Sequence, residues 1–172
     1  HWENVTPKDL PEWAYIYCIE SSTHDPDVLY LSATRYKLDD NRPYLYKSVD
    51  GGRNWKNICG NYPENEISRV IREDPKNPGL LFVGSETGIC FSHNDGANWN
   101  RLGGNFPVVP VYDLKIKDDE MVVATHGRSF WILDDLNPIR ESSRFKAEDD
   151  FHFFPPKSTF RRTLNWSTNL FM

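Results

Sequence analysis

The stretch Tyr46-Lys-Ser-Val-Asp-Gly-Gly-Arg-Asn-Trp55 decides the fold, because Phe91-Ser-His-Asn-Asp-Gly-Ala-Asn-Trp99 repeats its pattern. Both copies have the form Ser-x-(Asp/Asn)-x-Gly-x-x-Trp. The two serines are 44 residues apart, and so are the two tryptophans. Four fixed positions that recur in register indicate an internal structural repeat.

The flanks of the two copies repeat as well. Asp25-Pro26 precedes an apolar run over 28–34, and Asp74-Pro75 precedes a second run over 80–85. Short runs of β-branched and aromatic residues bounded by Pro, Gly, Asn and Asp predict strands. We expect strands at 13–20, 28–34, 44–48, 55–58, 67–73, 80–85, 89–93, 99–102, 111–117, 120–125 and 129–134. The third unit leaves its fourth strand undefined.

Units of this length with four strands each are typical of β-propeller blades. The sequence therefore predicts an all-β chain of about three to four four-stranded antiparallel blades, part of a larger propeller. An open β-sandwich is the alternative, but it gives no reason for a motif to recur at a fixed spacing. We expect blades over 1–145, with units at about 13–58, 67–102 and 111–140. A C-terminal strand or tail follows over 146–172, in which 151–156 resembles a strand.

Composition excludes several classes of function. The net charge of −5 provides no basic field for a phosphate backbone, so nucleic acid is not an expected partner. No apolar run is long enough for a membrane span. Cys18, Cys59 and Cys90 form no CxxC pair and are expected as small core or strand residues, with one disulfide plus a free thiol as the alternative.

The repeated motif has the chemistry of a tight turn. The Asp50 carboxylate can accept hydrogen bonds from backbone N–H groups further along the turn, and Gly52 supplies a positive φ. Trp55 opens the next strand with a large ring to bury. In the second copy Asn94 replaces the aspartate, and its amide oxygen can still accept. We therefore expect a structural role, rather than a catalytic or calcium-binding one.

These turns resemble the Asp-box, and the units resemble the propellers of bacterial-neuraminidase-repeat (BNR) proteins. The run over 122–136 is similar to the last propeller unit of large, secreted, sortilin-like BNR proteins, often labelled glycosyl-hydrolase-like by fold. Further matches are Arg72-Glu-Asp-Pro75, 34–40 and 153–156, and the similarity covers about residues 5–160. The resemblance implies a structural role for Ser48, Asp50, Gly52, Trp55, Ser92, Asn94, Gly96 and Trp99.

The same resemblance implies that the chain is the C-terminal part of a propeller region, with an extracellular or periplasmic location. Three or so blades cannot close a ring, and an open set leaves sheet edges and blade faces exposed. We therefore expect further propeller blades from the same or another chain as partners.

Candidate site residues gather on the end of the blades opposite the repeated turns, because successive connections in a blade alternate between its two ends. The predicted ligand-binding residues are Arg35, Tyr36, Glu86, His126 and Arg128. Glu86 with Asp39 or Asp40 is the best candidate for a catalytic carboxylate pair. The alternative is that these charges are solvated loop residues and strand-end caps. No metal-ligand spacing and no cofactor motif is found, so neither is expected.

Two functions remain open at this stage. The repeats and the lack of a catalytic constellation favour a non-catalytic binding or scaffold module that recognises a protein, peptide or glycan. The resemblance favours, as the alternative, a fragment of a secreted glycoside hydrolase that acts on polysaccharide. Whether the chain is an enzyme is left undecided, because fold does not imply function.

Overall fold

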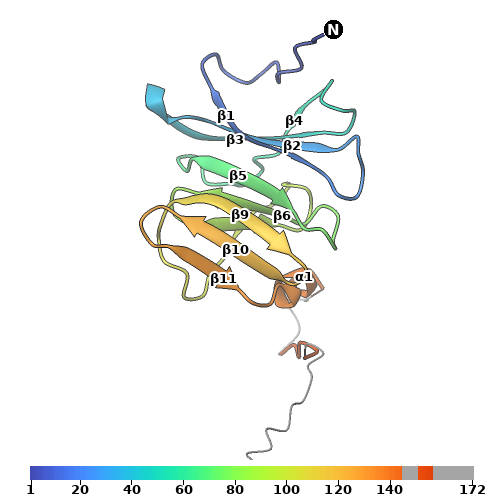
Figure 1. Cartoon of the computed structure of the whole chain (residues 1–172), viewed down its shortest axis with the longest axis vertical. Coiled ribbons are helices and arrows are strands. Elements are labelled where there is room, and N and C mark those ends of the chain that lie inside the picture. The colour runs from blue at the N-terminus through green and yellow to red at the C-terminus, as the bar shows by residue number, and fades with distance from the viewer. Residues whose placement is uncertain (145–150, 157–172) are drawn as a thin grey trace, which may run out of the picture.

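The chain folds into three consecutive antiparallel sheets (Figure 1). The structure is a computed structural model, and it describes residues 1–144 and 151–156. Each sheet is one propeller blade, formed by strands that are consecutive in the sequence. The predicted all-β propeller architecture is confirmed.

Two blades have four strands and the third has three. The first contains β1 (Tyr15–Ser21), β2 (Leu29–Arg35), β3 (Asp40–Ser48) and β4 (Lys56–Asn57), with a 3-10 turn, η1, at Tyr36–Leu38. The second contains β5 (Ser68–Glu73), β6 (Leu81–Ser85), β7 (Ile89–Ser92) and β8 (Asn100–Arg101). The third contains β9 (Val111–Lys117), β10 (Glu120–Thr125) and β11 (Phe130–Leu133).

The core lies between the blades, because alternate residues of each strand face opposite neighbours. In the second blade Ile71 faces the first blade, where it shares one apolar cluster with Tyr30 and Leu45. Phe82 and Leu114 share the next cluster, between the second and third blades. The middle blade is therefore apolar on both faces, which explains the unbroken apolar run that forms β6.

Each inner strand has a β-bulge near its first residues. The pairing skips Tyr17 in β1, Arg69 in β5 and Tyr112 in β9, so each of these residues is the extra one in its strand. A bulge redirects the side chain that it carries. Three side chains from three blades therefore leave the normal alternation at the same end of the molecule.

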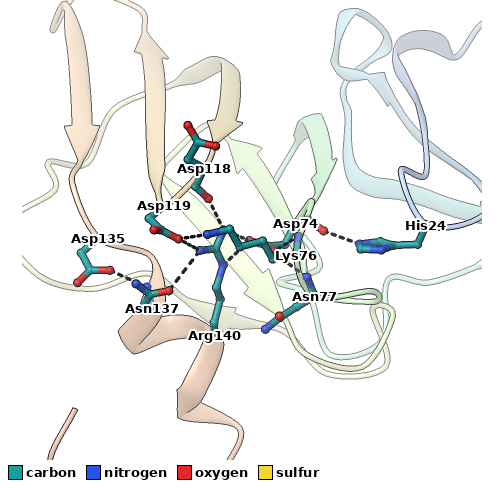
Figure 2. A network of polar contacts seen from close by, with 9 residues as sticks. All are labelled: His24, Asp74, Lys76, Asn77, Asp118, Asp119, Asp135, Asn137 and Arg140. Atoms are coloured by element: carbon teal, nitrogen blue, oxygen red, sulfur yellow. Dashed lines mark hydrogen bonds and ion pairs between the residues drawn. The ribbon is translucent and has the colours of Figure 1, made fainter. Parts of the chain in front are cut away.

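The third blade ends in a helix rather than a fourth strand. After β11 the chain forms α1 (Asn137–Ser142), with Pro138 in its first turn. Arg140 of α1 is buried and pairs with Asp74 at 2.9 Å, while its other nitrogen contacts Asp119 (Figure 2). The same guanidinium donates to the Asp118 carbonyl at 2.8 Å. This network ties α1 to the hairpins of the second and third blades.

Two expectations about other segments need comment. The strand expected at 151–156 is wrong, since those residues form no strand, and the rest of the expected tail over 146–172 lies outside the described residues. The three cysteines are free thiols, so the alternative of a disulfide is wrong too. No helix within the described residues is long and apolar enough to cross a membrane.

Candidate functional site

A hollow of about 390 Å³ opens at the end of the blades opposite the repeated turns. It lies where the inner strands begin, beside the 3-10 turn η1. The bulge residues of all three blades, Tyr17, Arg69 and Tyr112, contribute to its wall. The lining residues are Trp13, Tyr15, Tyr17, Thr34, Arg35, Tyr36, Lys37, Leu38, Arg69 and Tyr112.

Arg69 is the central cation of this hollow. Its guanidinium carbon lies 4.3 Å from the ring centre of Tyr112 and 5.7 Å from the ring centres of both Tyr17 and Tyr36. Tyr17 and Tyr112 also meet edge to face, with ring centres 6.4 Å apart. A desolvated guanidinium over aromatic faces is attracted to each ring. The arginine therefore fixes the orientation of three tyrosines from three elements.

The charge of Arg69 is balanced within the protein. Its Nε and Nη2 donate to the Glu86 carboxylate at 2.9 and 3.0 Å, in a two-pronged pair. Burial would lower the pKa of Arg69, but the hydrogen bonds and charge of Glu86 outweigh it and raise that pKa. Burial raises the pKa of Tyr17, although the nearby Arg69 charge opposes the shift. The hollow thus combines a neutral phenol wall with an internally paired cation.

Aromatic side chains form the rim of the hollow. Trp13 is 84% exposed and has a positive φ of 65°, directly before the strand that carries Tyr15 and Tyr17. Tyr15 and Tyr36 are exposed as well. Exposed rings beside a concavity offer flat apolar faces with polar edges, which is the usual lining of a ligand site.

The wall also holds a polar atom with no partner. Thr34 follows a break in the β2–β3 register, and its side chain is buried. Its hydroxyl oxygen makes no hydrogen bond to any of the described residues. A buried hydroxyl without a partner costs free energy, on the order of 1–3 kcal/mol.

Of the carboxylates expected as a catalytic pair, Asp40 and Glu86 are engaged by arginines. Asp40 accepts from Arg42 at 2.8 and 2.9 Å, from the Tyr44 hydroxyl at 2.7 Å and from Arg35 at 3.3 Å. The hydrogen bonds from Arg42 are the main reason why the pKa of Asp40 lies well below its usual range, although burial opposes the shift. Such a carboxyl stays ionised and cannot serve as a general acid near neutrality. Asp39 ends η1 with a φ of 57° and is exposed.

The remaining predicted ligand residues lie at different distances from the hollow. His126 is exposed and stacks on Tyr112, with ring centres 5.2 Å apart, so it borders the same wall. Arg128 lies further along the β10–β11 hairpin, where its carbonyl accepts from the Trp131 indole at 3.0 Å. It makes no ion pair with any described residue, which leaves its side chain in solvent rather than on Asp134 or Asp135.

The repeated turns lie at the other end of the blades and have the same hydrogen bonds twice. Ser48 Oγ accepts from the Gly52 N–H at 2.9 Å, and Asp50 accepts from the Asn54 N–H at 2.8 Å. In the second blade the same bonds measure 2.9 Å at Ser92 and 2.8 Å at Asn94. The backbone N–H of Asn54 is the main reason why the pKa of Asp50 is lowered to about 2. The indoles of Trp55 and Trp99 each donate to a backbone carbonyl outside their own turn.

Sequence reasoning missed Arg69, Tyr17 and Tyr112. Two positions after each of these residues lie Ile19, Ile71 and Leu114. These three residues pair with equivalent positions in the second strand of their blades. That shared register is the signal that could have found them, since the repeat places all three at one depth. The bulge that turns them toward a common hollow leaves no mark in the sequence.

The chemical groups of this site are aromatic rings, phenol hydroxyls and paired charges. Within the residues that the structure describes, no group of three His, Cys, Asp or Glu side chains is arranged to hold a metal ion. Both nearby carboxylates are paired with arginines. What the hollow presents is aromatic surface and phenol hydroxyls.

Comparisons with solved structures agree with the fold. The chain is similar to the GH74 enzyme of Niastella koreensis, with 15% identity and a TM-score of 0.53 over 70% of this chain and 21% of that one. It is similar to the GH74 xyloglucanase of Xanthomonas campestris, with 14% identity and a TM-score of 0.52 over 67% of this chain and 20% of that one. YCF48 from Cyanidioschyzon merolae gives 18% identity and a TM-score of 0.52 over 73% and 35%.

These neighbours are β-propellers, and the chain has a propeller-repeat fold. Because the sequence identities are low, the similarity to these structures shows the fold alone. The chain spans about a fifth of the length of the two GH74 enzymes and about a third of YCF48. No protein-family model matches the chain, and no curated protein matches it.

Proposed function

We propose that this chain is a non-catalytic binding module whose aromatic hollow holds a glycan. The observation that carries the proposal is the wall itself, in which Trp13 and four tyrosines line the hollow together with a cation that is already paired. Apolar C–H faces of sugar rings pack on aromatic faces, while sugar hydroxyls need donors and acceptors at the ring edges. The phenol hydroxyls provide those groups.

The charge pattern supports a neutral ligand over an ionic one. Arg69 is neutralised by Glu86, and Asp40 is neutralised by Arg42. A protein site for an anion or cation presents an uncompensated charge of the opposite sign. The buried charges beside the hollow, Arg69 and Asp40, are each paired with an opposite charge, and the lining residue Lys37 is exposed to solvent, so a hydroxyl-rich neutral chain suits the aromatic wall best.

The finer family assignment is part of the same proposal. The duplicated turns support a BNR relationship in which Ser48, Asp50, Gly52 and Trp55 form one Asp-box, and their counterparts form a second. A sortilin-like protein of extracellular or periplasmic location would meet polysaccharide there, in keeping with a glycan ligand. The GH74 neighbours, one of which is a xyloglucanase, make xyloglucan a sensible first probe.

The proposal is tested by titrating the full chain with soluble xyloglucan and with cellohexaose, both uncharged, while following tryptophan fluorescence and binding heat. We expect Trp13→Ala and Tyr36→Ala each to weaken binding about fivefold or more, because truncation of an aromatic anchor costs over about 1 kcal/mol. Trp2→Ala is the matched control, since Trp2 is fully exposed and does not line the hollow.

The outcomes separate the ligand classes. Binding that Trp13→Ala weakens and Trp2→Ala leaves unchanged supports a glycan site in the hollow. Equal loss in both variants refutes the assignment of the hollow. Binding of a peptide pool in place of either glycan refutes the ligand class.

A glycoside hydrolase fragment is the second candidate, favoured by the two carboxylates beside the hollow. Glu86 contacts the lining residue Arg69, and Asp40 contacts the lining residue Arg35. Release of reducing ends from xyloglucan by the wild-type chain, abolished in Glu86→Gln, would support this reading. Binding without any release of reducing ends would support the binding module.

A further inference from the structure

One ion pair joins the walls of two hollows. Arg69 lines the aromatic hollow described above. Its partner Glu86 lines a second hollow, of about 450 Å³. The Glu86 side chain is 38% exposed, whereas that of Arg69 is only 5% exposed. The carboxylate is therefore within reach of solvent, and the guanidinium that it neutralises is not.

The surroundings of Arg69 have the geometry of a carboxylate-binding site. Its Nε and Nη2 donate side by side to the two carboxylate oxygens of Glu86, at 2.9 and 3.0 Å. Its guanidinium carbon lies 4.3–5.7 Å from the ring centres of Tyr17, Tyr36 and Tyr112. A planar guanidinium held between rings presents a fixed fork of donors, which matches a carboxylate. Glu86 is thus the occupant of a site that a free carboxylate could also fit.

The hairpin between β6 and β7 keeps Glu86 in that place. The Ser85 N–H donates to the Gly88 carbonyl at 2.8 Å, and the Thr87 N–H donates to Ser85 Oγ at 3.2 Å. Arg101 Nη2 donates to the Thr87 carbonyl at 2.6 Å. The residues on both sides of Glu86 are therefore fixed. A group tethered at its site competes at an effective concentration of roughly millimolar or higher, so a dissolved carboxylate is at a disadvantage.

Loss of the Glu86 carboxylate would leave Arg69 without an opposite charge. Among the described residues, no other carboxylate forms an ion pair with Arg69. A buried charge without a partner is costly, so the guanidinium would favour any anion that could approach it. The vacated place is open to solvent, because Glu86 itself is partly exposed.

We propose that Glu86 determines the charge specificity of the aromatic hollow: it fills a carboxylate site on Arg69 and thereby excludes sugars that carry carboxylates. The choice of sugars as the excluded ligands rests on the proposed glycan function, whereas the carboxylate site itself does not. A charged sugar would meet an arginine that is already engaged and a glutamate of its own sign. A neutral sugar meets rings and hydroxyls alone, so the fixed glutamate discriminates between the two classes.

The first test compares two ligands that differ in charge. The full chain is titrated with cellohexaose and with the β-linked hexamer of glucuronate, which carries carboxylates in place of the primary alcohols. The quantity measured is the affinity for the charged hexamer divided by that for the neutral one. We expect Glu86→Gln to raise this ratio about tenfold or more, because a carboxylate then gains charge-assisted hydrogen bonds from Arg69. Added salt should reduce the gain.

Glu64→Gln is the matched control. Glu64 is an exposed glutamate of the second hollow, and Arg69 pairs with Glu86 instead. Both variants remove one negative charge, and both keep the exposed Lys37 of the aromatic hollow. A rise of the ratio in Glu86→Gln alone supports the proposal. An equal rise in both variants overturns it, because that result reflects net charge. Wild-type binding of the charged hexamer as tight as that of cellohexaose overturns it too.

The second test needs no sugar. Glu86→Ala should bind acetate in the place of the missing carboxylate, so its Tm should rise by about 2–4 °C more in sodium acetate than in sodium chloride of equal ionic strength. The wild type and Glu64→Ala should show no such difference. Arg69→Met together with Glu86→Ala should lose the response, because the guanidinium is gone. Glu86→Ser takes the place of the alanine variant if the latter shows no cooperative melt.

The two tests fail in different ways. If no chain binds either hexamer, the glycan function is refuted, while a rise of Tm specific to acetate still supports the carboxylate site. If acetate gives no specific rise in Glu86→Ala, or the same rise in the double variant, the site on Arg69 is refuted, whatever the hollow binds.

Discussion

Replacement of Arg140 by alanine is expected to be among the most destabilising single changes in the described fold. The side chains of Arg140 and Asp74 are 5% and 0% exposed, and their closest atoms lie 2.9 Å apart. The substitution removes the cation and leaves the Asp74 carboxylate buried. Among the described residues, that carboxylate keeps the hydrogen bonds from the backbone N–H groups of Lys76 and Asn77.

The magnitude follows from the burial of the pair. Removal of one partner from a buried ion pair costs about 3–5 kcal/mol, because the remaining charge is desolvated and uncompensated. For a chain of this size that corresponds to a fall in Tm on the order of 10 °C. Added salt should change the loss little, since buried charges are weakly screened.

Urea denaturation followed by circular dichroism measures the effect, and Arg42→Ala is the matched control. Arg42 also pairs with an aspartate, but its side chain is 64% exposed. An exposed pair contributes about 0–1 kcal/mol, so this variant should unfold close to the wild type. If Arg140→Ala costs no more than Arg42→Ala, the reasoning from burial is wrong and α1 is not held by this ion pair.

Three further predictions concern packing, pH and thiol reactivity. Gly84→Ala should lower stability by about 1–3 kcal/mol in thermal melts, because its new Cβ would lie 2.6 Å from a Val111 methyl, while Gly103→Ala, with nothing within 4 Å, should be neutral. The pKa of Asp50 in the folded chain is about 2, below its unfolded value, so the unfolded chain binds more protons. Stability should therefore fall as the pH drops from about 4 to 2. Asp50→Asn should make the fall in Tm over this pH range smaller, as thermal melts at each pH would show. Burial raises the pKa of Cys90 to about 11, so iodoacetamide at pH 8 should label it only in urea, as mass spectrometry would show.

The sequence predicted the strands well because the repeat contains two copies of the same strand and turn pattern, which could be compared with each other. Ser48 and Ser92 fixed the register, and the turn residues between apolar runs marked the strand ends. The end of the third blade was harder to predict, since its helix depends on Arg140 reaching Asp74 in another blade. No local sequence pattern around Arg140 indicates that its partner, Asp74, lies 66 positions away.

The candidate site was predicted in part. Arg35 and Tyr36 line the hollow, and Glu86 and His126 contact residues that line it. Arg69 was missed because a β-bulge, rather than residue type, turns it into the hollow. A bulge arises from pairing between strands, so its effect becomes visible only when the strands are assembled.

The tryptophans of the repeated turns bear on the order in which the blades can fold during synthesis. The Trp55 indole binds a carbonyl 50 residues earlier in the chain, and the Trp99 indole binds one 41 residues earlier. Both bonds run backward, so each acceptor has already been synthesised when its donor leaves the ribosome. Since domains assemble from the N-terminus during translation, a new blade can lock onto its predecessor without waiting for any later segment. Growth of the blade stack can therefore keep pace with synthesis, one blade after another.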